Sequence, residues 1–148
     1  MKILVDADAC PVKNIALKVA KEYKIPIIMI KNICHELHDD YAQIITVDQG
    51  RDMADIVLIN NTKDGDVVIT QDYGVAALAL SKKAVAINQN GLIYTNENID
   101  GLLMRRHTNQ QNRRKHKKYT KVPKRTKEDN ERFEKKFRKL IEDRLNKK

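Results

Sequence analysis

The chain has 148 residues, of which 41% are hydrophobic and 33% charged, and its formal net charge is +9 at pH 7. This length and composition predict one globular domain with its own core and exclude a disordered chain. The two cysteines, Cys10 and Cys34, form no C-x-x-C pair, so we expect neither a disulfide framework nor a structural zinc site. The longest apolar run, Ile25–Ile30, is too short to span a membrane, and because Met1–Val5 runs straight into a predicted strand we expect no signal peptide. We therefore expect a cytoplasmic protein without membrane contact.

Strand and helix signals alternate over the first 106 residues. Runs rich in Ile and Val predict strands at Lys2–Val5, Ile25–Ile30, Ile44–Val47, Asp66–Thr70, Ala84–Ile87 and Leu92–Tyr94. Apolar residues at helical spacing predict helices over Pro11–Ala20, Asp52–Ile59, Tyr73–Ser81 and Asn96–Arg106, with Asn96 as a cap. Continuous apolar strands separated by helices predict an α/β domain over residues 1–106, with a mostly parallel central sheet.

The pattern changes after this domain. Residues 107–126 are basic and polar without apolar periodicity, which predicts an exposed loop or linker. Residues 127–148 predict a C-terminal amphipathic helix over about Lys127–Asn146. Its apolar face contains Phe133, Phe137, Leu140, Ile141 and Leu145. We expect this helix to dock on its own domain or on a second copy, so a homo-oligomer stays open.

The charge is divided unevenly along the chain. Residues 1–100 hold 10 Lys and Arg against 14 Asp and Glu, whereas residues 101–148 hold 19 against 6. An acidic body with a basic tail indicates a site for cations beside a surface that attracts polyanions, although a solvated tail without a partner would look the same. We expect the tail to contact the phosphate backbone of a nucleic acid, most readily RNA, without reading its sequence. The basic residues concerned are Arg105, Arg106, Arg113, Arg114, Lys115, Lys117, Lys118, Lys121, Lys124 and Arg125.

Acidic residues follow the predicted strands at their carboxyl ends. Asp6 and Asp8 come after the first strand and Asp72 after the fourth, while Asp52 and Asp55 share one face near the start of a helix. Ligands of parallel α/β sheets bind beyond the carboxyl ends of the strands, so we expect these side chains to converge. Converging carboxylates repel each other unless protons or cations occupy the site, and their oxygens suit Mg²⁺ or Mn²⁺. Each Asp taken alone could equally be a helix cap or a turn residue.

Three functions are compatible with these residues. A metal-dependent nuclease acting on RNA or single-stranded nucleic acid would hold Mg²⁺ or Mn²⁺ with Asp6, Asp8, Asp55 and Asp72 and use metal-activated water. Thr70 would then orient a carboxylate, unless it is simply a residue that favours strands. A haloacid-dehalogenase-like phosphatase would use Asp6 as nucleophile and Asp8 as acid and base. A non-catalytic nucleic-acid-binding protein would need only the basic tail.

Four stretches resemble those of the bacterial YaiI/YqxD family. Residues 5–12 read Val-Asp-Ala-Asp-Ala-Cys-Pro-Val, residues 51–55 read Arg-Asp-Met-Ala-Asp, and residues 65–72 read Gly-Asp-Val-Val-Ile-Thr-Gln-Asp. The fourth, residues 88–103, contains Gly91, Tyr94, Thr95, Asn98, Ile99 and Asp100. The resemblance implies a three-layer PIN-like fold, related to metal-dependent ribonucleases. It also implies that Asp6, Asp55 (or Asp52) and Asp72 correspond to the acids of a PIN nuclease site. Where PIN nucleases carry a fourth acid, just beyond Asp72, this sequence has Tyr73 and Gly74.

Overall fold

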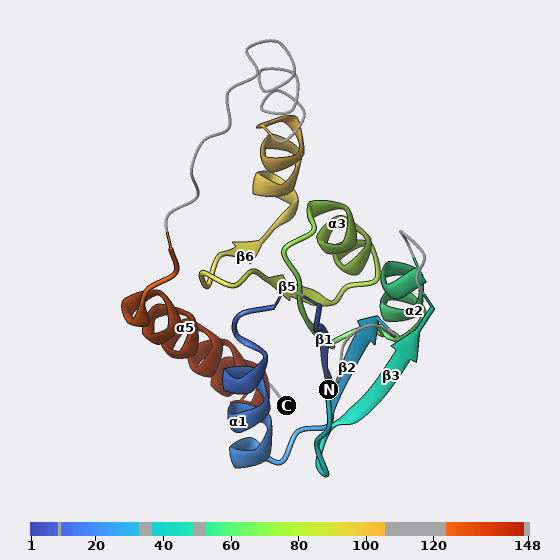
Figure 1. The fold of residues 1–148 in the computed structure, drawn as a ribbon. Coiled ribbons are helices and arrows are strands. Elements are labelled where there is room, and N and C mark those ends of the chain that lie inside the picture. The colour runs from blue at the N-terminus through green and yellow to red at the C-terminus, as the bar shows by residue number, and fades with distance from the viewer. Residues whose placement is uncertain (9, 33–36, 49–52, 106–123, 147–148) are drawn as a thin grey trace.

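The computed structural model describes residues 1–8, 10–32, 37–48, 53–105 and 124–146. Predicted Asp52 and Arg106 lie outside these ranges. The strands are β1 (Ile3–Asp6), β2 (Ile27–Asn32), β3 (Gln43–Val47), β4 (Val67–Ile69), β5 (Val85–Ile87) and β6 (Ile93–Tyr94). The helices are α1 (Lys13–Tyr23), α2 (Met53–Asn61), α3 (Tyr73–Ser81) and α5 (Lys127–Asn146), and residues 96–105 are helical as well. The predicted α/β class with a C-terminal helix is confirmed (Figure 1).

The six strands form one sheet in the order β3-β2-β1-β4-β5-β6. All neighbouring pairs are parallel except β5 and β6, which are antiparallel. Gly91 has a φ of +87° in the hairpin turn that connects these two strands, a conformation that glycine adopts readily. The chain runs outward from β1 to β3 and then returns to place β4 on the other side of β1. This reversal makes the carboxyl ends of β1 and β4 a topological switch point, where open α/β sheets bind their ligands.

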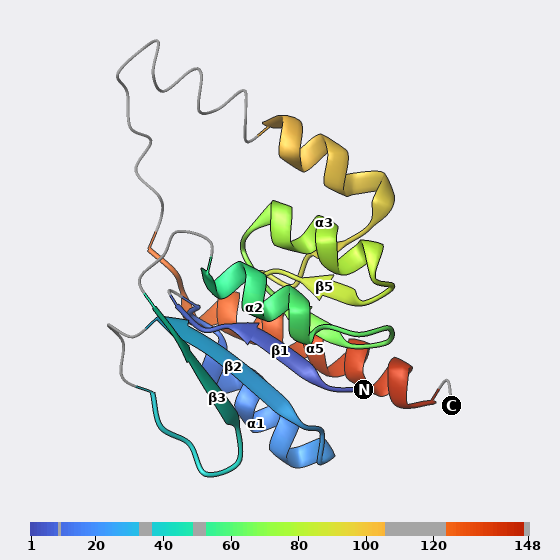
Figure 2. The same cartoon turned by 90° about the vertical axis from the view of Figure 1, so that its right-hand side faces the viewer.

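Helices cover both faces of the sheet, which gives three layers (Figure 2). On one face, α1 and α5 lie side by side, and Phe133, Phe137 and Ile141 of α5 are fully buried. The two phenylalanine rings stack with their centroids 5.2 Å apart. The apolar face of α5 therefore completes the core that α1 begins.

The other face carries α2, α3 and the helix over residues 96–105. Leu58, Val75 and Ile99 anchor these three helices in a second apolar cluster. In the part of the chain that the structure describes, no helix is both long and apolar enough to cross a membrane.

The cap of the helix over residues 96–105 differs from the prediction. The Thr95 hydroxyl accepts the N–H of Asn98 at 3.1 Å, and the Asn98 side-chain oxygen accepts the N–H of Thr95 at 2.9 Å. Thr95 is thus the capping residue, and the assignment to Asn96 was wrong. Both residue types can cap, and the reciprocal bond with Asn98 decides between them.

Candidate functional site

Four of the predicted acidic residues lie around the switch point of the sheet. Asp6 is the last residue of β1, and Asp8 follows in the turn before α1. Asp72 immediately precedes α3, which follows β4, and Asp55 lies in the first turn of α2. All four side chains are half-buried. They come from three separate segments of the chain, so the fold brings them to one region of the sheet edge.

Main-chain N–H groups hold two of these carboxylates. An oxygen of Asp8 accepts the N–H of Asn32, at the end of β2, at 2.8 Å. Asp72 caps α3, because its Oδ1 accepts the N–H of Gly74 at 2.7 Å and that of Val75 at 3.2 Å. Backbone donors restrict the rotation of a carboxylate, so both side chains have a fixed orientation.

The cap explains why glycine follows at position 74. A Cβ atom there would lie 3.1 Å from Oδ1 of Asp72, which is tighter than ordinary contact. A larger residue at this position would push against the carboxylate that the helix start binds. The cap of α3 therefore gives a structural reason for glycine at position 74, in the region where PIN nucleases carry a fourth acid.

Thr70 and Tyr94 fix the backbone of Asp72 through two successive hydrogen bonds. The buried Thr70 hydroxyl accepts the N–H of Asp72 at 3.0 Å, so it acts on that residue through the main chain. The hydroxyl of Tyr94, which is also buried, donates to the carbonyl of Thr70 at 3.3 Å. Burial, with a smaller effect of neighbouring Tyr73, raises the pKa of Tyr94, so this hydroxyl stays protonated. Sequence reasoning placed Tyr94 in a strand and in a stretch that resembles the family, but did not connect it with the site.

The pKa of Asp6 depends on its burial and on the charges of the other three carboxylates. Burial raises its pKa from the ordinary 3.8 to about 6, and three negative charges add to the shift. These charges belong to Asp55, Asp8 and Asp72, in decreasing order of effect. The four carboxylates thus share one electrostatic environment, which a cation would relieve.

The carboxylate oxygens suit a hard divalent cation, but the four side chains are not positioned to coordinate one. Within residues 1–8, 10–32, 37–48, 53–105 and 124–146, no group of three His, Cys, Asp or Glu side chains is arranged to hold a metal ion. Binding would require these carboxylates to draw closer together. Asp52, the fifth predicted ligand, lies outside the described residues.

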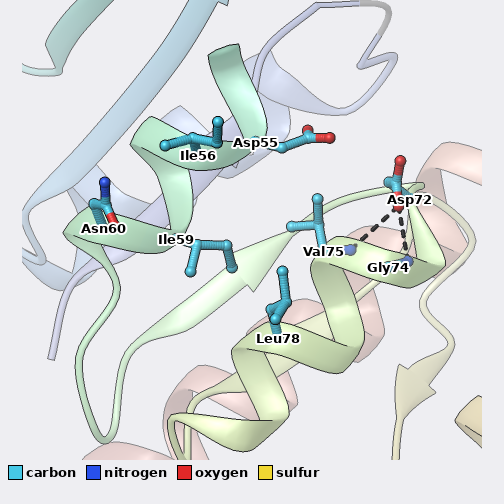
Figure 3. A pocket seen from close by; sticks show the side chains of 8 residues that line it. All are labelled: Asp55, Ile56, Ile59, Asn60, Asp72, Gly74, Val75 and Leu78. Carbon is cyan, nitrogen blue, oxygen red and sulfur yellow. Dashed lines mark hydrogen bonds between the residues drawn. The ribbon is translucent and has the colours of Figure 1, made fainter. Parts of the chain in front are cut away.

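A pocket of about 460 Å³ opens between α2 and α3 (Figure 3). Asp55 and Asp72 belong to its wall, and in Figure 3 the Asp55 side chain extends from α2 toward Asp72. The remaining lining residues are Ile56, Ile59, Asn60, Gly74, Val75 and Leu78. The pocket depends on how two helices pack, and nothing in the sequence pattern indicated it.

Three of the basic residues predicted to bind nucleic acid are described. Arg105 and Lys124 are exposed, whereas Arg125 is half-buried. The Arg125 guanidinium donates to the Gln89 carbonyl at 2.6 Å and to the side-chain oxygens of Asn90 and Asn130 at 3.1 and 2.7 Å. It joins the start of α5 to the connection between β5 and β6. Arg106, Arg113, Arg114, Lys115, Lys117, Lys118 and Lys121 lie outside the described residues.

Comparison with known proteins places this chain in a family. A family model described as "Uncharacterized BCR, YaiI/YqxD family" matches residues 4–143. A UPF0178 protein of Alkaliphilus oremlandii (strain OhILAs) is 74% identical over 134 residues, which cover 90% of this chain and 86% of the relative. A UPF0178 protein of Natranaerobius thermophilus is 51% identical, over 95% of this chain and 96% of the relative. No solved structure matches the chain. By the extent of these matches, the protein belongs to the bacterial YaiI/YqxD family, whose members carry the name UPF0178.

Proposed function

We propose that this protein is a metal-dependent phosphodiesterase that acts on RNA or single-stranded nucleic acid. The observation that carries the proposal is the position of Asp6, Asp8, Asp55 and Asp72 around the switch point of a parallel sheet. Half-buried carboxylates that repel one another lower stability, so a function that uses them is the simplest reason for their arrangement.

The chemistry follows from the donor type. Asp6, Asp8, Asp55 and Asp72 would hold Mg²⁺ or Mn²⁺, which prefer carboxylate oxygens. When bound, such an ion stabilises negative charge on a phosphate and makes water more acidic. Backbone N–H groups keep Asp8 and Asp72 oriented throughout.

Charge along the chain supports a polyanionic substrate. The acidic cluster alone would repel phosphate, so the substrate must be attracted by positive charge elsewhere. Residues 101–148 supply it, with 19 Lys and Arg against 6 Asp and Glu. Arg105 and Lys124 are exposed members of this group. Backbone contacts of this kind predict binding that weakens as salt is added.

The first test is calorimetric titration with Mn²⁺ at neutral pH, together with cleavage of single-stranded RNA. The variant is Asp72→Asn, because the amide oxygen of Asn can still cap α3 while the charge is removed. We expect Mn²⁺ affinity to fall by about 10-fold or more and cleavage to be lost. Asp64→Asn, in the exposed turn before β4, is the matched control and should behave as the wild type. Equal Mn²⁺ binding and cleavage in Asp72→Asn would refute the assignment.

A non-catalytic nucleic-acid-binding protein is the second candidate. It is favoured by the finding that no three metal-ligating side chains stand together within the described part of the chain. Under this function the carboxylates are structural and the basic residues alone bind the ligand. It predicts strongly salt-dependent RNA binding that is unchanged by chelators and by Asp72→Asn.

A further inference from the structure

The pocket between α2 and α3 joins the acidic cluster to an apolar surface. Asp55 and Asp72 belong to both, since they line the pocket and act on Asp6. The other walls come from aliphatic side chains of the two helices, Ile56 and Ile59 from α2 and Val75 and Leu78 from α3 (Figure 3). A ligand bound here would therefore touch apolar side chains and two of the candidate metal-binding residues at once.

Two of these aliphatic side chains are unusually open to solvent. Ile56 is 53% exposed and Leu78 is 52% exposed, and neighbouring Met53 at the start of α2 is 42% exposed. One exposed aliphatic residue needs no explanation, but several around one concave site mark a place where a ligand binds. Their cost to solubility would be offset if an apolar group covers them in the functional complex.

The shape and polarity of the pocket limit its occupant. Its volume of about 460 Å³ is in the range of small-molecule sites and could take one nucleoside. The occupant must be apolar on its faces to pack against Ile56 and Leu78. Its edge must be polar, because the carboxylates of Asp55 and Asp72 and the amide of Asn60 lie in the same wall. A nucleobase has both properties, with apolar faces and amino or imino groups along its edge.

A second copy of the chain is a weaker fit. An apolar helix face seated on this surface would remove the two carboxylates from water without providing donors or cations. Covering carboxylates with an apolar surface is unfavourable. The occupant that the walls favour is therefore partly polar.

We propose that the α2–α3 pocket receives one unpaired nucleobase of the strand whose phosphate lies at Asp6, Asp8, Asp55 and Asp72. This inference rests on the proposed function for the position of the phosphate. It assigns the substrate class more narrowly, because a base that is paired and stacked within a duplex cannot enter a pocket between two helices. Selection of single strands then results from the pocket, whereas the basic residues bind phosphates of either form.

The test measures binding rather than cleavage. A short end-labelled RNA strand, the same strand with abasic residues, and the corresponding duplex are titrated by fluorescence anisotropy in the presence of Ca²⁺. Leu78→Gln makes one wall polar at an exposed helix position where Gln is well tolerated. Leu92→Gln is the matched control, because Leu92 is 38% exposed and does not line the pocket.

We expect the wild type to bind the strand that carries bases about tenfold more tightly than the abasic strand. Leu78→Gln should lose this preference and keep its affinity for the abasic strand, while Leu92→Gln should behave as the wild type. Equal affinity of the wild type for both strands, an absence of binding, tighter binding of the duplex, or an unchanged preference in Leu78→Gln would each overturn the inference. Concentration-dependent self-association that Leu78→Gln abolishes, without any preference for bases, would assign the pocket to a second copy instead.

Failure of the pocket inference can be distinguished from failure of the proposed function. A preference for bases without Mn²⁺-dependent cleavage would support the pocket and refute the phosphodiesterase. Mn²⁺-dependent cleavage of strands with and without bases at equal rates would support the phosphodiesterase and refute the pocket.

Discussion

The two ends of the sheet differ in what surrounds their aspartates. At the amino end, Asp66 precedes β4 and is only 3% exposed, and its carboxylate is paired with the ammonium group of Lys2. It also accepts the backbone N–H groups of Lys2 and Lys63 at 3.1 and 2.9 Å. At the carboxyl end, Asp6 meets three further carboxylates. The fold neutralises the first charge with its own groups and concentrates the second set around one point.

This contrast separates a structural carboxylate from a candidate functional one. A buried charge that is paired and fully hydrogen-bonded is compatible with a stable fold. A half-buried carboxylate among other carboxylates lowers stability until protons or a cation arrive. Removing charge should therefore destabilise the protein at the amino end and stabilise it at the carboxyl end.

The largest expected change in stability is at the amino end of the sheet, where Asp66 lies. Asp66→Ala removes the partner of the Lys2 ammonium group and the acceptor of the backbone N–H groups of Lys2 and Lys63. We expect the free energy of unfolding to fall by about 3–4 kcal/mol, measured by urea denaturation. Asp64→Ala, in the exposed turn two residues earlier, should change it by less than about 0.5 kcal/mol. If the two variants were equally stable, the pairing of Asp66 would have no structural importance.

Asp6→Asn is expected to raise the free energy of unfolding, whereas Asp66→Ala lowers it. The folded protein has a pKa of about 6 at Asp6 against 3.8 in the unfolded chain, so between these pH values the folded state binds more protons. The free energy of unfolding of the wild type should therefore decrease as pH rises from about 4 to about 6 and change no further above that through this group.

At pH 7.5 and without divalent metal, Asp6→Asn should be more stable than the wild type by up to about 3 kcal/mol, and at pH 4 the difference should vanish. Thermal unfolding across this pH range measures both. Asp48→Asn, at an exposed position after β3, is the matched control and should show no such gain. A gain that was the same at pH 4 and pH 7.5 would rule out charge repulsion as its cause.

The smallest expected effect distinguishes two buried threonines. Thr70→Val removes the acceptor for the N–H of Asp72, and Thr62→Val removes a hydroxyl that donates to the carbonyl of Leu58 at 2.8 Å. Each variant should lose about 1 kcal/mol of unfolding free energy. Only Thr70→Val should also weaken Mn²⁺ binding, by about 10-fold, because it loosens Asp72. Calorimetry on both variants checks this, and equal Mn²⁺ affinity would restrict Thr70 to a stabilising role.

Local patterns in the sequence were enough for the fold class and for the order of the elements. Continuous apolar runs mark buried parallel strands, and an Asp directly after such a run must lie at a strand end. The positions of Asp6 and Asp72 relative to β1 and β4 could therefore be predicted. Their binding of a metal stays a prediction.

Features that depend on tertiary contacts were not accessible in this way. The pair of Lys2 and Asp66 joins residues 64 positions apart, and the sequence placed Asp66 only at the start of a predicted strand. The bond from Tyr94 to Thr70 and the pocket between α2 and α3 likewise arise from packing between separate segments. At the helix over residues 96–105, two neighbouring residues were both acceptable caps, and only the reciprocal bond with Asn98 identified Thr95.

The position of α5 has a consequence for the order of synthesis. Every strand of the sheet and all four carboxylates precede Lys127, yet Phe133, Phe137 and Ile141 fill the core beneath α1. A nascent chain that had emerged from the ribosome only as far as β6 would leave the apolar face of α1 open to water. The core can therefore be completed only after α5 has been translated. A chain that stops early would be a substrate for chaperones and proteases rather than a working protein.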